Sequence, residues 1–300
     1  MLRVAINGYG RIGRVVHRQL VERFPKEVEV VAINASSDAA MRQYLLKYDT
    51  LHGRFGGDVE LDGENLLVNG SPVRVVKERD PAKCPWKELK VDIVVESSGK
   101  FRTREKSEAH RTAGAKAVLV TAPPKDDIAM IVRGVNDDIL KKSLPIVSAA
   151  SCTTNSIAPV VKVLDEWKGV KRGLMCTTHS YTSSQNLLDN STDSSKLRIS
   201  RAAALNIIPS TTGAAKAIGK VFPHLKGKID GMALRIPVPD VSASYLALEL
   251  KGSVTAEEVN EQLRRVSEGE LKGILGVEEG LLVSSDYISD PHSSTVDLDS

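Results

Sequence analysis

The sequence lacks any long uninterrupted run of apolar residues, and it begins with the strand-like segment Met1-Leu2-Arg3-Val4-Ala5-Ile6. A membrane-spanning helix needs about 20 consecutive apolar residues, and a signal peptide needs a different layout. The chain also has only three cysteines, Cys84, Cys152 and Cys176. They make neither a disulfide framework nor a metal-ligand cluster. These absences predict a cytoplasmic protein without a metal site.

A strong charge of one sign is also missing. The 41 basic residues are scattered among 38 acidic ones, and the net charge is +3. This balance argues against nucleic-acid binding as the main activity, although anionic small molecules remain suitable ligands. No membrane partner is expected, because no apolar run approaches membrane-spanning length. The length of 300 residues and the hydrophobic fraction of 41% are ordinary for a soluble protein with two domains.

The first motif is the glycine-rich segment Gly8-Tyr9-Gly10-Arg11-Ile12-Gly13. It follows the apolar run at residues 2–7 and precedes a helical pattern and a second apolar run at residues 27–33. A GxGxxG motif between a strand and a helix binds a dinucleotide, because its glycines permit a tight turn and let the pyrophosphate approach the helix N-terminus. The alternative is a glycine-rich turn in another kind of α/β protein. We expect Gly8, Gly10 and Gly13 to contact the cofactor.

The second apolar run ends in Ile33-Asn34-Ala35-Ser36-Ser37, without the acidic residue typical of NAD-specific proteins. An acid there would repel the 2′-phosphate of NADP by about 4 kcal/mol at about 4 Å in a surface-like dielectric. It would also give NAD a charge-assisted hydrogen bond worth about 1.5–3 kcal/mol. Its absence around Asn34 and Ala35 therefore favours NADP. The alternative is that Asp38 reaches back from the loop and takes the usual acidic role.

Two further apolar runs, at residues 91–95 and 117–120, are predicted to be buried parallel strands. They are followed by Glu96-Ser97-Ser98-Gly99 and by Thr121-Ala122-Pro123. Small residues at the carboxyl ends of parallel strands are expected beside the cofactor, which selects Ser97, Gly99 and Thr121. The basic stretch at residues 100–106 is predicted to be a solvated helix face.

The most reactive candidate lies in Ser151-Cys152-Thr153-Thr154-Asn155, which is followed by a helical pattern. Ser151 or Thr153 is expected to cap this helix, so that Cys152 lies at its N-terminus. Unsatisfied N–H groups there favour a thiolate. Downstream, His179 lies near the end of a β-rich run, and it is either the partner of Cys152 or a structural histidine. The spacing alone leaves both possibilities open.

Together these segments resemble phosphorylating glyceraldehyde-3-phosphate dehydrogenase. The segments that carry the resemblance, in chain order, are Gly8-Tyr9-Gly10-Arg11-Ile12-Gly13-Arg14, Lys47-Tyr48-Asp49, Ser151-Cys152-Thr153-Thr154-Asn155, His179-Ser180-Tyr181-Thr182, Ile208-Pro209-Ser210-Thr211-Thr212-Gly213-Ala214-Ala215-Lys216 and Leu234-Arg235-Ile236-Pro237-Val238-Pro239. The resemblance implies an α/β fold in which a Rossmann dinucleotide-binding domain, residues 1–151, precedes a mixed α/β catalytic domain with a large sheet, residues 152–300. It also implies a homotetramer.

The resemblance further implies a role for individual residues. Cys152 resembles the nucleophile and His179 its acid–base partner. The residues that resemble binders of the substrate phosphate and of inorganic phosphate are Ser151, Thr153, Thr182, Arg198, Thr212, Gly213 and Arg235. Those that resemble further cofactor contacts are Arg11, Ile12, Arg79 and Thr121. At Arg198 many bacterial members carry two consecutive arginines, whereas Ile199 follows here, so the alternative is a surface charge on the loop at residues 190–200.

Two departures from the family pattern concern the cofactor. Ala35 stands where NAD-specific members carry Asp, and Asn190-Ser191 replaces a common Leu-Pro pair. Both resemble the NADP-accepting branch found in plastids and in a gluconeogenic bacterial paralogue, and Ser191 is expected to hydrogen-bond the 2′-phosphate. Family members also continue beyond the position of Ser300 through a strand and a helix with an Asn that orients the nicotinamide. The C-terminal end is therefore expected to be missing.

The predicted function is the phosphorylating oxidation of D-glyceraldehyde 3-phosphate to 1,3-bisphosphoglycerate, and the reverse reduction, through a thioester on Cys152. The cofactor is NADP or NAD, with NADP preferred, and inorganic phosphate is the second substrate. Such an enzyme could serve glycolysis, gluconeogenesis or the Calvin cycle. The alternatives are an erythrose-4-phosphate dehydrogenase and a non-catalytic regulatory or binding paralogue.

Overall fold

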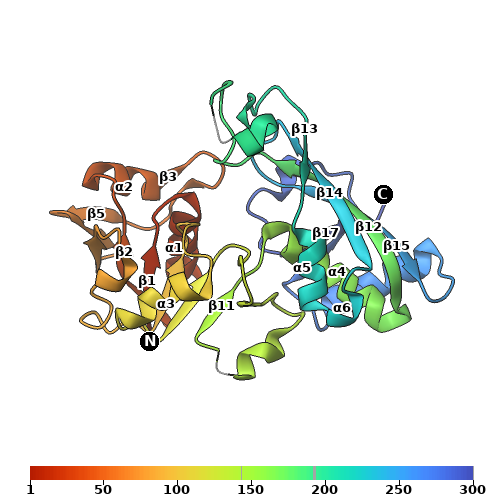
Figure 1. Ribbon diagram of the computed structural model, residues 1–300, viewed down its shortest axis with the longest axis horizontal. Helices are drawn as coiled ribbons and strands as arrows, with labels where there is room; N and C mark the ends of the chain where they lie inside the picture. The colour runs from red at the N-terminus through yellow and green to blue at the C-terminus, as the bar shows by residue number, and fades with distance from the viewer. Residues whose placement is uncertain (143, 192–193, 300) are drawn as a thin grey trace. The chain divides into compact units, whose positions relative to one another are not determined.

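The computed structural model describes residues 1–142, 144–191 and 194–299. Ser300, the last residue of the predicted catalytic domain, lies outside the described residues. The chain forms two compact units (Figure 1). Unit 1 comprises Met1–Ile131 and Asp138–Ala150, and unit 2 comprises Val132–Asp137 and the chain from Ser151 onward. The predicted division at residues 151/152 stays a prediction.

Unit 1 is built on a nine-stranded sheet with the order β10-β11-β9-β8-β1-β2-β7-β6-β5. Its strands are β1 (Leu2–Asn7), β2 (Val28–Asn34), β5 (Val59–Asp62), β6 (Asn65–Val68), β7 (Ser71–Val76), β8 (Ile93–Glu96), β9 (Ala117–Val120), β10 (Ala129–Met130) and β11 (Ile146–Ser148). The strands from β10 to β7 pair in parallel, and β5 to β7 form an antiparallel meander. The remaining elements are α1 (Arg11–Arg23), α2 (Ala39–Lys47), α3 (Arg104–Thr112), the short strands β3 (Tyr48–Asp49) and β4 (Gly53–Arg54), and the 3-10 helices η1 (Pro81–Lys83) and η2 (Asp137–Lys142).

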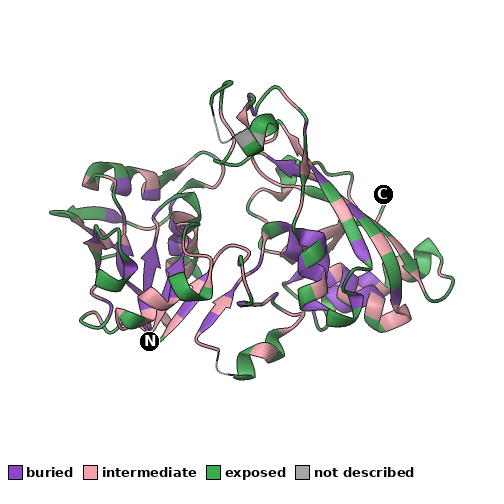
Figure 2. Ribbon diagram, viewed as in Figure 1, coloured by how far each residue is buried: buried purple, intermediate pink, exposed green. Residues whose placement is uncertain are grey.

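The central strands of unit 1 are apolar on both faces. Val4 and Ile6 belong to one core cluster, while Ala5 between them belongs to a second cluster with Trp86. Successive side chains of a strand point to opposite faces of the sheet, so the two clusters lie on opposite sides of β1. Figure 2 shows these strands as buried. The parallel pairing of β1 with β2 and β8, and of β8 with β9, aligns the carboxyl ends of these strands at one edge of the sheet.

Unit 2 contains a four-stranded sheet with the order β13-β14-β12-β15. Its strands are β12 (Val170–Ser180), β13 (Ile208–Thr211), β14 (Ile229–Ile236) and β15 (Ala243–Leu250), and a separate parallel pair is formed by β16 (Leu275–Glu278) and β17 (Ser294–Asp297). The helices are α4 (Cys152–Lys168), α5 (Ala214–Val221), α6 (Ala256–Glu268) and the 3-10 helices η3 (Ser194–Ser200), η4 (Pro223–Leu225) and η5 (Ser284–Tyr287). Figure 1 shows α4, α5 and α6 grouped on one side of the four strands.

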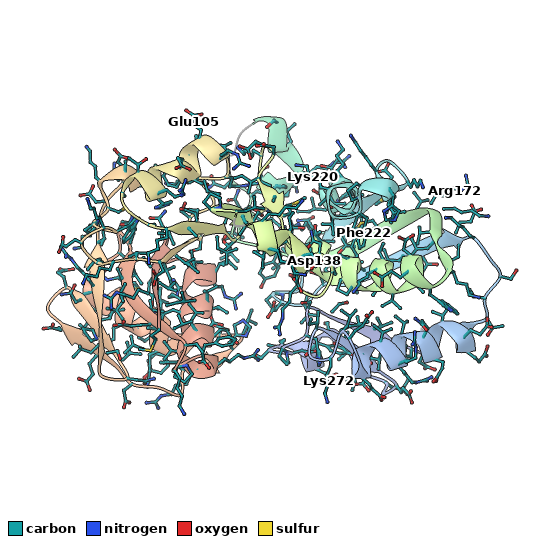
Figure 3. All side chains as sticks on the ribbon, turned by 90° about the horizontal axis from the view of Figure 1, so that it is seen from below. Glu105, Asp138, Arg172, Lys220, Phe222 and Lys272 are labelled. Carbon is teal, nitrogen blue, oxygen red and sulfur yellow. The ribbon has the colours of Figure 1, made fainter. Side chains whose placement is uncertain are left out.

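The other face of the four-stranded sheet carries exposed apolar side chains. Cys176 pairs with Met232 on β14 and with Tyr245 on β15, so these three side chains share a face, and Leu174 precedes Cys176 by two residues. Tyr245 is 73% exposed and Leu174 is 64% exposed. An exposed apolar face such as this one usually marks a binding surface. Elsewhere, the labelled charged side chains Glu105 and Arg172 project into solvent (Figure 3).

Most predicted strands are observed within a few residues of their expected bounds, and the predicted fold class, a Rossmann domain with a mixed α/β domain, is confirmed. The predicted basic helix face is wrong for Lys100 and Arg102, because α3 begins only at Arg104, after Thr103 caps it. Arg102 instead donates from Nε to the Pro123 carbonyl oxygen at 2.8 Å. Among the described residues, no helix is both long and apolar enough to cross a membrane.

Candidate active site

Helix α4 presents Cys152 as its first residue. Ser151 adopts extended backbone at the N-cap, and its hydroxyl accepts a hydrogen bond from the Thr154 N–H at 3.0 Å. Ser151, rather than Thr153, is therefore the cap, which is the first of the two expected alternatives. Buried residues such as Ile157 and Val161 hold the helix against unit 2. The first-turn N–H groups of α4 thus lie beside the sulfur, where they favour negative charge.

The imidazole of His179 lies against this sulfur. His179 Nε2 is 3.3 Å from Cys152 Sγ, and the residue is 8% exposed. His179 comes near the end of β12, and the parallel register between β12 and β14 puts Arg235 beside it. The structure therefore brings together the predicted nucleophile, its predicted base and one predicted phosphate ligand.

Arg235 also restricts the protonation of the imidazole. Its Nη1 lies 2.7 Å from His179 Nδ1 and 2.9 Å from the Ser180 carbonyl oxygen. An unprotonated Nδ1 accepts from the guanidinium, because arginine can only donate, and the ring proton then sits on Nε2. In the imidazolium, the Nδ1 proton goes to the Ser180 oxygen, which lies at 2.7 Å. Both forms present an Nε2 proton to Cys152.

The pKa of the Cys152 thiol reflects this environment. Partial burial raises the pKa, but the hydrogen bond and the charge of His179 outweigh burial, with a smaller contribution from Thr153, so the pKa lies below its ordinary value. Cys84 shows the opposite case, because burial and nearby carboxylates raise its pKa to about 12. Of these two cysteines, Cys152 is therefore the one whose surroundings favour the thiolate.

Two predicted phosphate ligands, Ser151 and Thr153, lie beside Cys152 at the start of α4, and the others fall into two groups. Thr212 and Gly213 lie at the N-terminus of α5, where Gly213 is the N-cap and the Thr212 hydroxyl accepts from the Ala214 N–H at 3.2 Å. Thr182 and Arg198 instead bond within their own loops or to the adjoining strand, Thr182 to Ser184 at 2.9 Å and Arg198 to the Pro209 carbonyl oxygen at 3.5 Å. Both side chains belong to exposed residues. Their predicted roles stay predictions.

The glycine-rich turn of unit 1 has the properties that a dinucleotide requires. Gly8 has φ +91°, and a Cβ there would lie 2.5 Å from the Ser98 nitrogen. A Cβ on Gly13 would lie 2.3 Å from the Gly8 carbonyl oxygen, whereas one on Gly10 would meet no described atom within 4 Å. The first and third glycines thus permit a tight turn and close packing, and the second leaves open space at the N-cap of α1. A pyrophosphate fits such a helix start.

Arg11 and Ile12 begin helix α1. Arg11 donates from Nη2 to Asp49 Oδ1 at 3.0 Å, and Ile12 is 57% exposed. Although burial raises the pKa of Asp49, hydrogen bonds from Arg11 and from two backbone N–H groups lower it well below its usual range. Asp49 therefore orients Arg11, which gives a structural reason for the Lys47-Tyr48-Asp49 motif.

At the adenosine end of the expected site, Asn34 is fully engaged. Its amide accepts from the Glu78 N–H at 3.0 Å and donates to the Glu78 carbonyl oxygen at 2.8 Å, which holds the segment that carries the exposed Arg79. Ala35 is buried, and the Asp38 carboxylate accepts from the Met41 N–H at 2.8 Å as the cap of α2. This cap uses one of the two Asp38 carboxylate oxygens. Ser191 belongs to unit 2 and is exposed.

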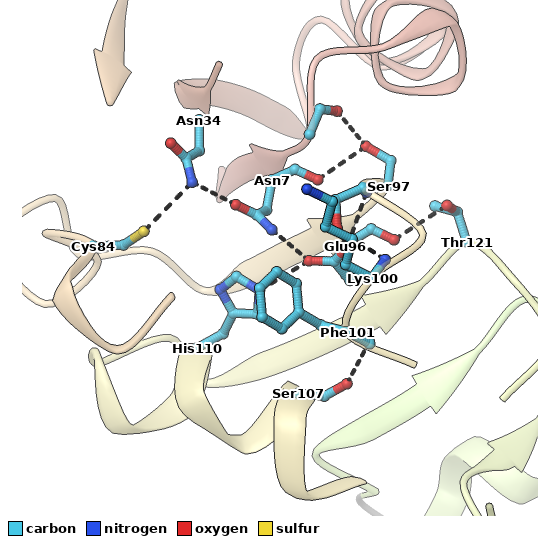
Figure 4. A network of polar contacts seen from close by, with 12 residues as sticks. Asn7, Asn34, Cys84, Glu96, Ser97, Lys100, Phe101, Ser107, His110 and Thr121 are labelled. Carbon is cyan, nitrogen blue, oxygen red and sulfur yellow. Dashed lines mark hydrogen bonds and ion pairs between the residues drawn. The ribbon is translucent and has the colours of Figure 1, made fainter. Parts of the chain in front are cut away.

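Beside the glycine turn, Ser97 donates from Oγ to the Gly8 carbonyl oxygen at 2.6 Å, and Thr121 donates to the Glu96 carbonyl oxygen at 3.1 Å. Gly99 follows with φ +72°. The sequence interpretation missed Glu96 itself, whose buried carboxylate is the centre of a polar network (Figure 4). The available signal was an acidic residue at the end of an otherwise apolar strand. Within the described parts of the chain, no three or more His, Cys, Asp or Glu side chains gather as metal ligands.

Comparisons with known proteins agree with this geometry. Residues 151–300 match the family model described as "Glyceraldehyde 3-phosphate dehydrogenase, C-terminal domain", and residues 2–104 match "Glyceraldehyde 3-phosphate dehydrogenase, NAD binding domain". The chain is 50% identical over 297 residues to glyceraldehyde-3-phosphate dehydrogenase of Geobacillus stearothermophilus, covering 99% of this chain and 88% of the relative. It is 49% identical over 297 residues to glyceraldehyde-3-phosphate dehydrogenase 2 of Bacillus subtilis, covering 99% of this chain and 86% of that protein.

Proposed function

The chain belongs to the glyceraldehyde 3-phosphate dehydrogenase family, and we propose that it oxidises D-glyceraldehyde 3-phosphate to 1,3-bisphosphoglycerate and catalyses the reverse reduction. Inorganic phosphate and NADP or NAD are the other substrates. The observation that carries this proposal is the 3.3 Å contact between Cys152 Sγ and His179 Nε2 at the start of a helix. A thiolate beside an imidazole suits acyl transfer through a thioester. The adjacent Arg235 suits a phosphorylated substrate.

The proposed reaction begins with attack of the Cys152 thiolate on the aldehyde carbon, while the Nε2 proton of the His179 imidazolium passes to the carbonyl oxygen. The ring that remains is neutral and keeps its Nδ1 proton, which it donates to the Ser180 carbonyl oxygen. The resulting hemithioacetal returns that proton to His179 as its C–H hydrogen leaves as hydride. The bound oxidised dinucleotide supplies the hydride acceptor at this point. Inorganic phosphate then attacks the thioester, which releases the acyl phosphate and restores the thiolate.

His179 contributes more than the acidification of Cys152. Lowering a thiol pKa from about 8.5 to about 6.5 raises the thiolate fraction about 25-fold at about pH 7. Nucleophilicity falls about 6- to 10-fold over the same change, if the Brønsted slope for disulfide exchange applies. The net gain is only about threefold. A positioned acid–base group contributes roughly 10²–10⁴-fold, so proton transfer at the hemithioacetal oxygen is the larger role of His179.

A Cys152→Ser variant tests the proposal directly. A serine hydroxyl stays protonated at neutral pH and cannot replace the thiolate, so dehydrogenase turnover should be lost. Undiminished turnover would refute the assignment of Cys152 as the nucleophile. Assays with glyceraldehyde 3-phosphate and with erythrose 4-phosphate, each with and without inorganic phosphate, separate the two dehydrogenase alternatives. Only the phosphorylating reaction depends on phosphate. A non-catalytic paralogue would turn over neither aldehyde.

For the cofactor, the proposal is a preference for NADP(H). Its support is the neutral Ala35 at the end of β2, the use of Asp38 as a helix cap, and the hydroxyl of Ser191. The expected result is a higher kcat/KM with NADP(H) than with NAD(H). An Ala35→Asp variant should reverse the order, since the new carboxylate repels the 2′-phosphate. Equal values in the unmodified protein would contradict the preference.

The proposed assembly is a homotetramer. Its support is the exposed apolar sheet face with Leu174, Met232 and Tyr245, which a second copy of the chain could cover. A Tyr245→Lys variant should form smaller species in light scattering coupled to size-exclusion chromatography. A monomeric wild-type protein would contradict the proposal. The physiological direction of the reaction and a cytoplasmic location stay predictions.

A further inference from the structure

The buried carboxylate of Glu96 joins the strand that leads into the glycine turn, the Ser97–Gly99 turn and helix α3. Glu96 ends β8 and is 1% exposed. Its Oε2 accepts from Asn7 Nδ2 at 2.5 Å and lies 3.0 Å from His110 Nε2. Its Oε1 accepts from the Ser98 N–H at 2.8 Å and from the Ser98 hydroxyl. Figure 4 shows Asn7 and His110 converging on this side chain.

The Glu96 carboxylate accepts its hydrogen bonds, and neighbouring contacts fix His110 and Asn7 as donors to it. The indole N–H of Trp86 can only donate, and it lies 3.1 Å from His110 Nδ1. His110 Nδ1 is therefore the acceptor, which puts the ring proton on Nε2, facing Glu96. On the other side, Asn34 Nδ2 donates to Asn7 Oδ1 at 2.7 Å, so the Asn7 amide must present its N–H₂ to Glu96.

This network reaches both ends of the expected cofactor site. Through Ser98, Glu96 fixes the turn that contains Ser97 and Gly99. Through Asn7 and Asn34, it connects to the backbone of Glu78, next to Arg79. The cluster belongs to unit 1, whereas the reacting groups Cys152 and His179 belong to unit 2. Its chemistry is that of a fixed acceptor, not of an acid or a base in the reaction.

We propose that Glu96 is the positioning residue of the cofactor site, holding the Ser97–Gly99 turn and the Asn34–Glu78 contact in the geometry that binds the dinucleotide. The proposal rests on the proposed cofactor contacts of unit 1. The role of Glu96 is to supply acceptors to Asn7, His110 and the Ser98 N–H, which cannot give up their donor role without a further conflict. A carboxylate does this, and an amide of the same shape does not.

The Glu96→Gln variant shows why an amide cannot replace the carboxylate. If the new N–H₂ replaces Oε2, it faces the donors of Asn7 and His110, and neither can reverse without creating a second conflict at Asn34 or Trp86. If it replaces Oε1, the Ser98 hydroxyl can rotate to accept, but the Ser98 N–H remains unpaired. The second arrangement has fewer conflicts, so the substitution releases the turn at Ser98 and leaves the remaining fold intact.

In the Glu96→Gln variant, the Ser97–Gly99 turn is no longer held by Glu96, and the unpaired Ser98 N–H turns to the solvent. Cofactor binding must then restore the geometry of this turn. The dissociation constants for NAD and NADP should therefore rise about tenfold, which corresponds to about 1.4 kcal/mol and lies within the cost of a buried unpaired donor. The Ser98 amide should lose hydrogen-exchange protection. The rate at which a thiol reagent labels Cys152 in cofactor-free protein should not change, because Cys152 belongs to unit 2.

The experiment measures these quantities by calorimetric titration, hydrogen exchange and thiol labelling of the full chain. Val68→Ala is the matched control, since Val68 is a buried core residue of unit 1 on β6. It should lower stability without changing cofactor affinity. Ser98→Ala is a second variant that retains the buried carboxylate. It removes one donor to Glu96 and the acceptor of the Lys100 N–H, so affinity should fall about threefold.

The proposal is overturned if Glu96→Gln binds both dinucleotides as tightly as the wild type, or if Val68→Ala weakens binding equally. It is also overturned if Glu96→Gln fails to fold and Ser98→Ala binds normally. Weaker binding in Glu96→Gln and Ser98→Ala, with binding retained in Val68→Ala, supports it. A wild-type chain that binds neither dinucleotide would instead contradict the proposed function itself.

Discussion

The buried His17 beneath the glycine-rich turn predicts a specific loss of stability in mild acid. His17 lies in α1 and is 1% exposed, and its Nδ1 is 2.6 Å from the hydroxyl of Tyr9. Its Nε2 has no hydrogen-bond partner among the residues that the structure describes. Burial lowers the pKa of His17 from 6.5 to about 4. The folded chain therefore favours the neutral His17 ring over the protonated one.

The sign follows from proton linkage. Between pH 6.5 and about 4 the unfolded chain binds a proton at His17 and the folded chain does not, so the free energy of unfolding falls as the pH falls through this window. With these two pKa values, the loss amounts to about 2 kcal/mol between about pH 7.5 and pH 5. The contribution of the neutral His17 ring to the free energy of unfolding is fully present well above pH 6.5.

The assay is urea unfolding of the cofactor-free chain at pH 7.5 and pH 5, for wild type and for His17→Phe. The phenylalanine ring fills the same space but does not titrate, so the variant should lose about 2 kcal/mol less than the wild type over this interval. Other titrating groups are common to both proteins and cancel in the difference. Equal pH dependence in the two proteins would refute the assignment of a buried neutral His17.

Three further predictions concern the candidate active site and the start of α1. Alkylation of Cys152 should reach half its maximal rate at a lower pH than alkylation of an ordinary thiol, and His179→Gln should shift that midpoint upward, because burial then acts without the opposing imidazole; an unshifted midpoint would exclude His179 as the cause. Arg235→Gln should raise the KM for the phosphorylated aldehyde about 10- to 100-fold, as expected for a lost charge-assisted contact; steady-state kinetics with an unchanged KM would contradict its role. Asp49→Asn should lower the free energy of unfolding at neutral pH by about 1 kcal/mol or less. This difference should vanish as the pH falls through the depressed pKa of Asp49, below 3.8, and a difference that persists there would point to another cause.

Local sequence signals identified the elements that present the reactive groups. The order of strand, glycine turn and helix at residues 2–23 depends on neighbouring residues, and so does the cap that Ser151 provides to α4. A glycine with φ +91° and a serine that bonds three residues ahead are short-range effects. The sequence therefore indicated both the dinucleotide turn and the cysteine at a helix N-terminus.

The partners of those groups required the tertiary structure. Spacing left His179 open between a catalytic and a structural role, and the parallel register of β12 with β14 is what places Arg235 against it. Glu96 and Asn7 are 89 residues apart, and only the pairing of β1 with β8 brings them together. Such contacts depend on strand order and on burial from both faces, which no local pattern encodes.

By itself, therefore, the sequence determined the family, the cofactor class and the helix that begins at Cys152, since these follow from motifs and caps a few residues long. The tertiary structure decided which imidazole faces the sulfur, and that the buried Glu96 holds the turn beside Gly8. The physical reason is the range of the interactions. Backbone propensities and helix caps depend on residues within about one helical turn. The partners in the Asn7–Glu96 and Arg235–His179 contacts are instead distant in the sequence and become neighbours only in the folded sheets.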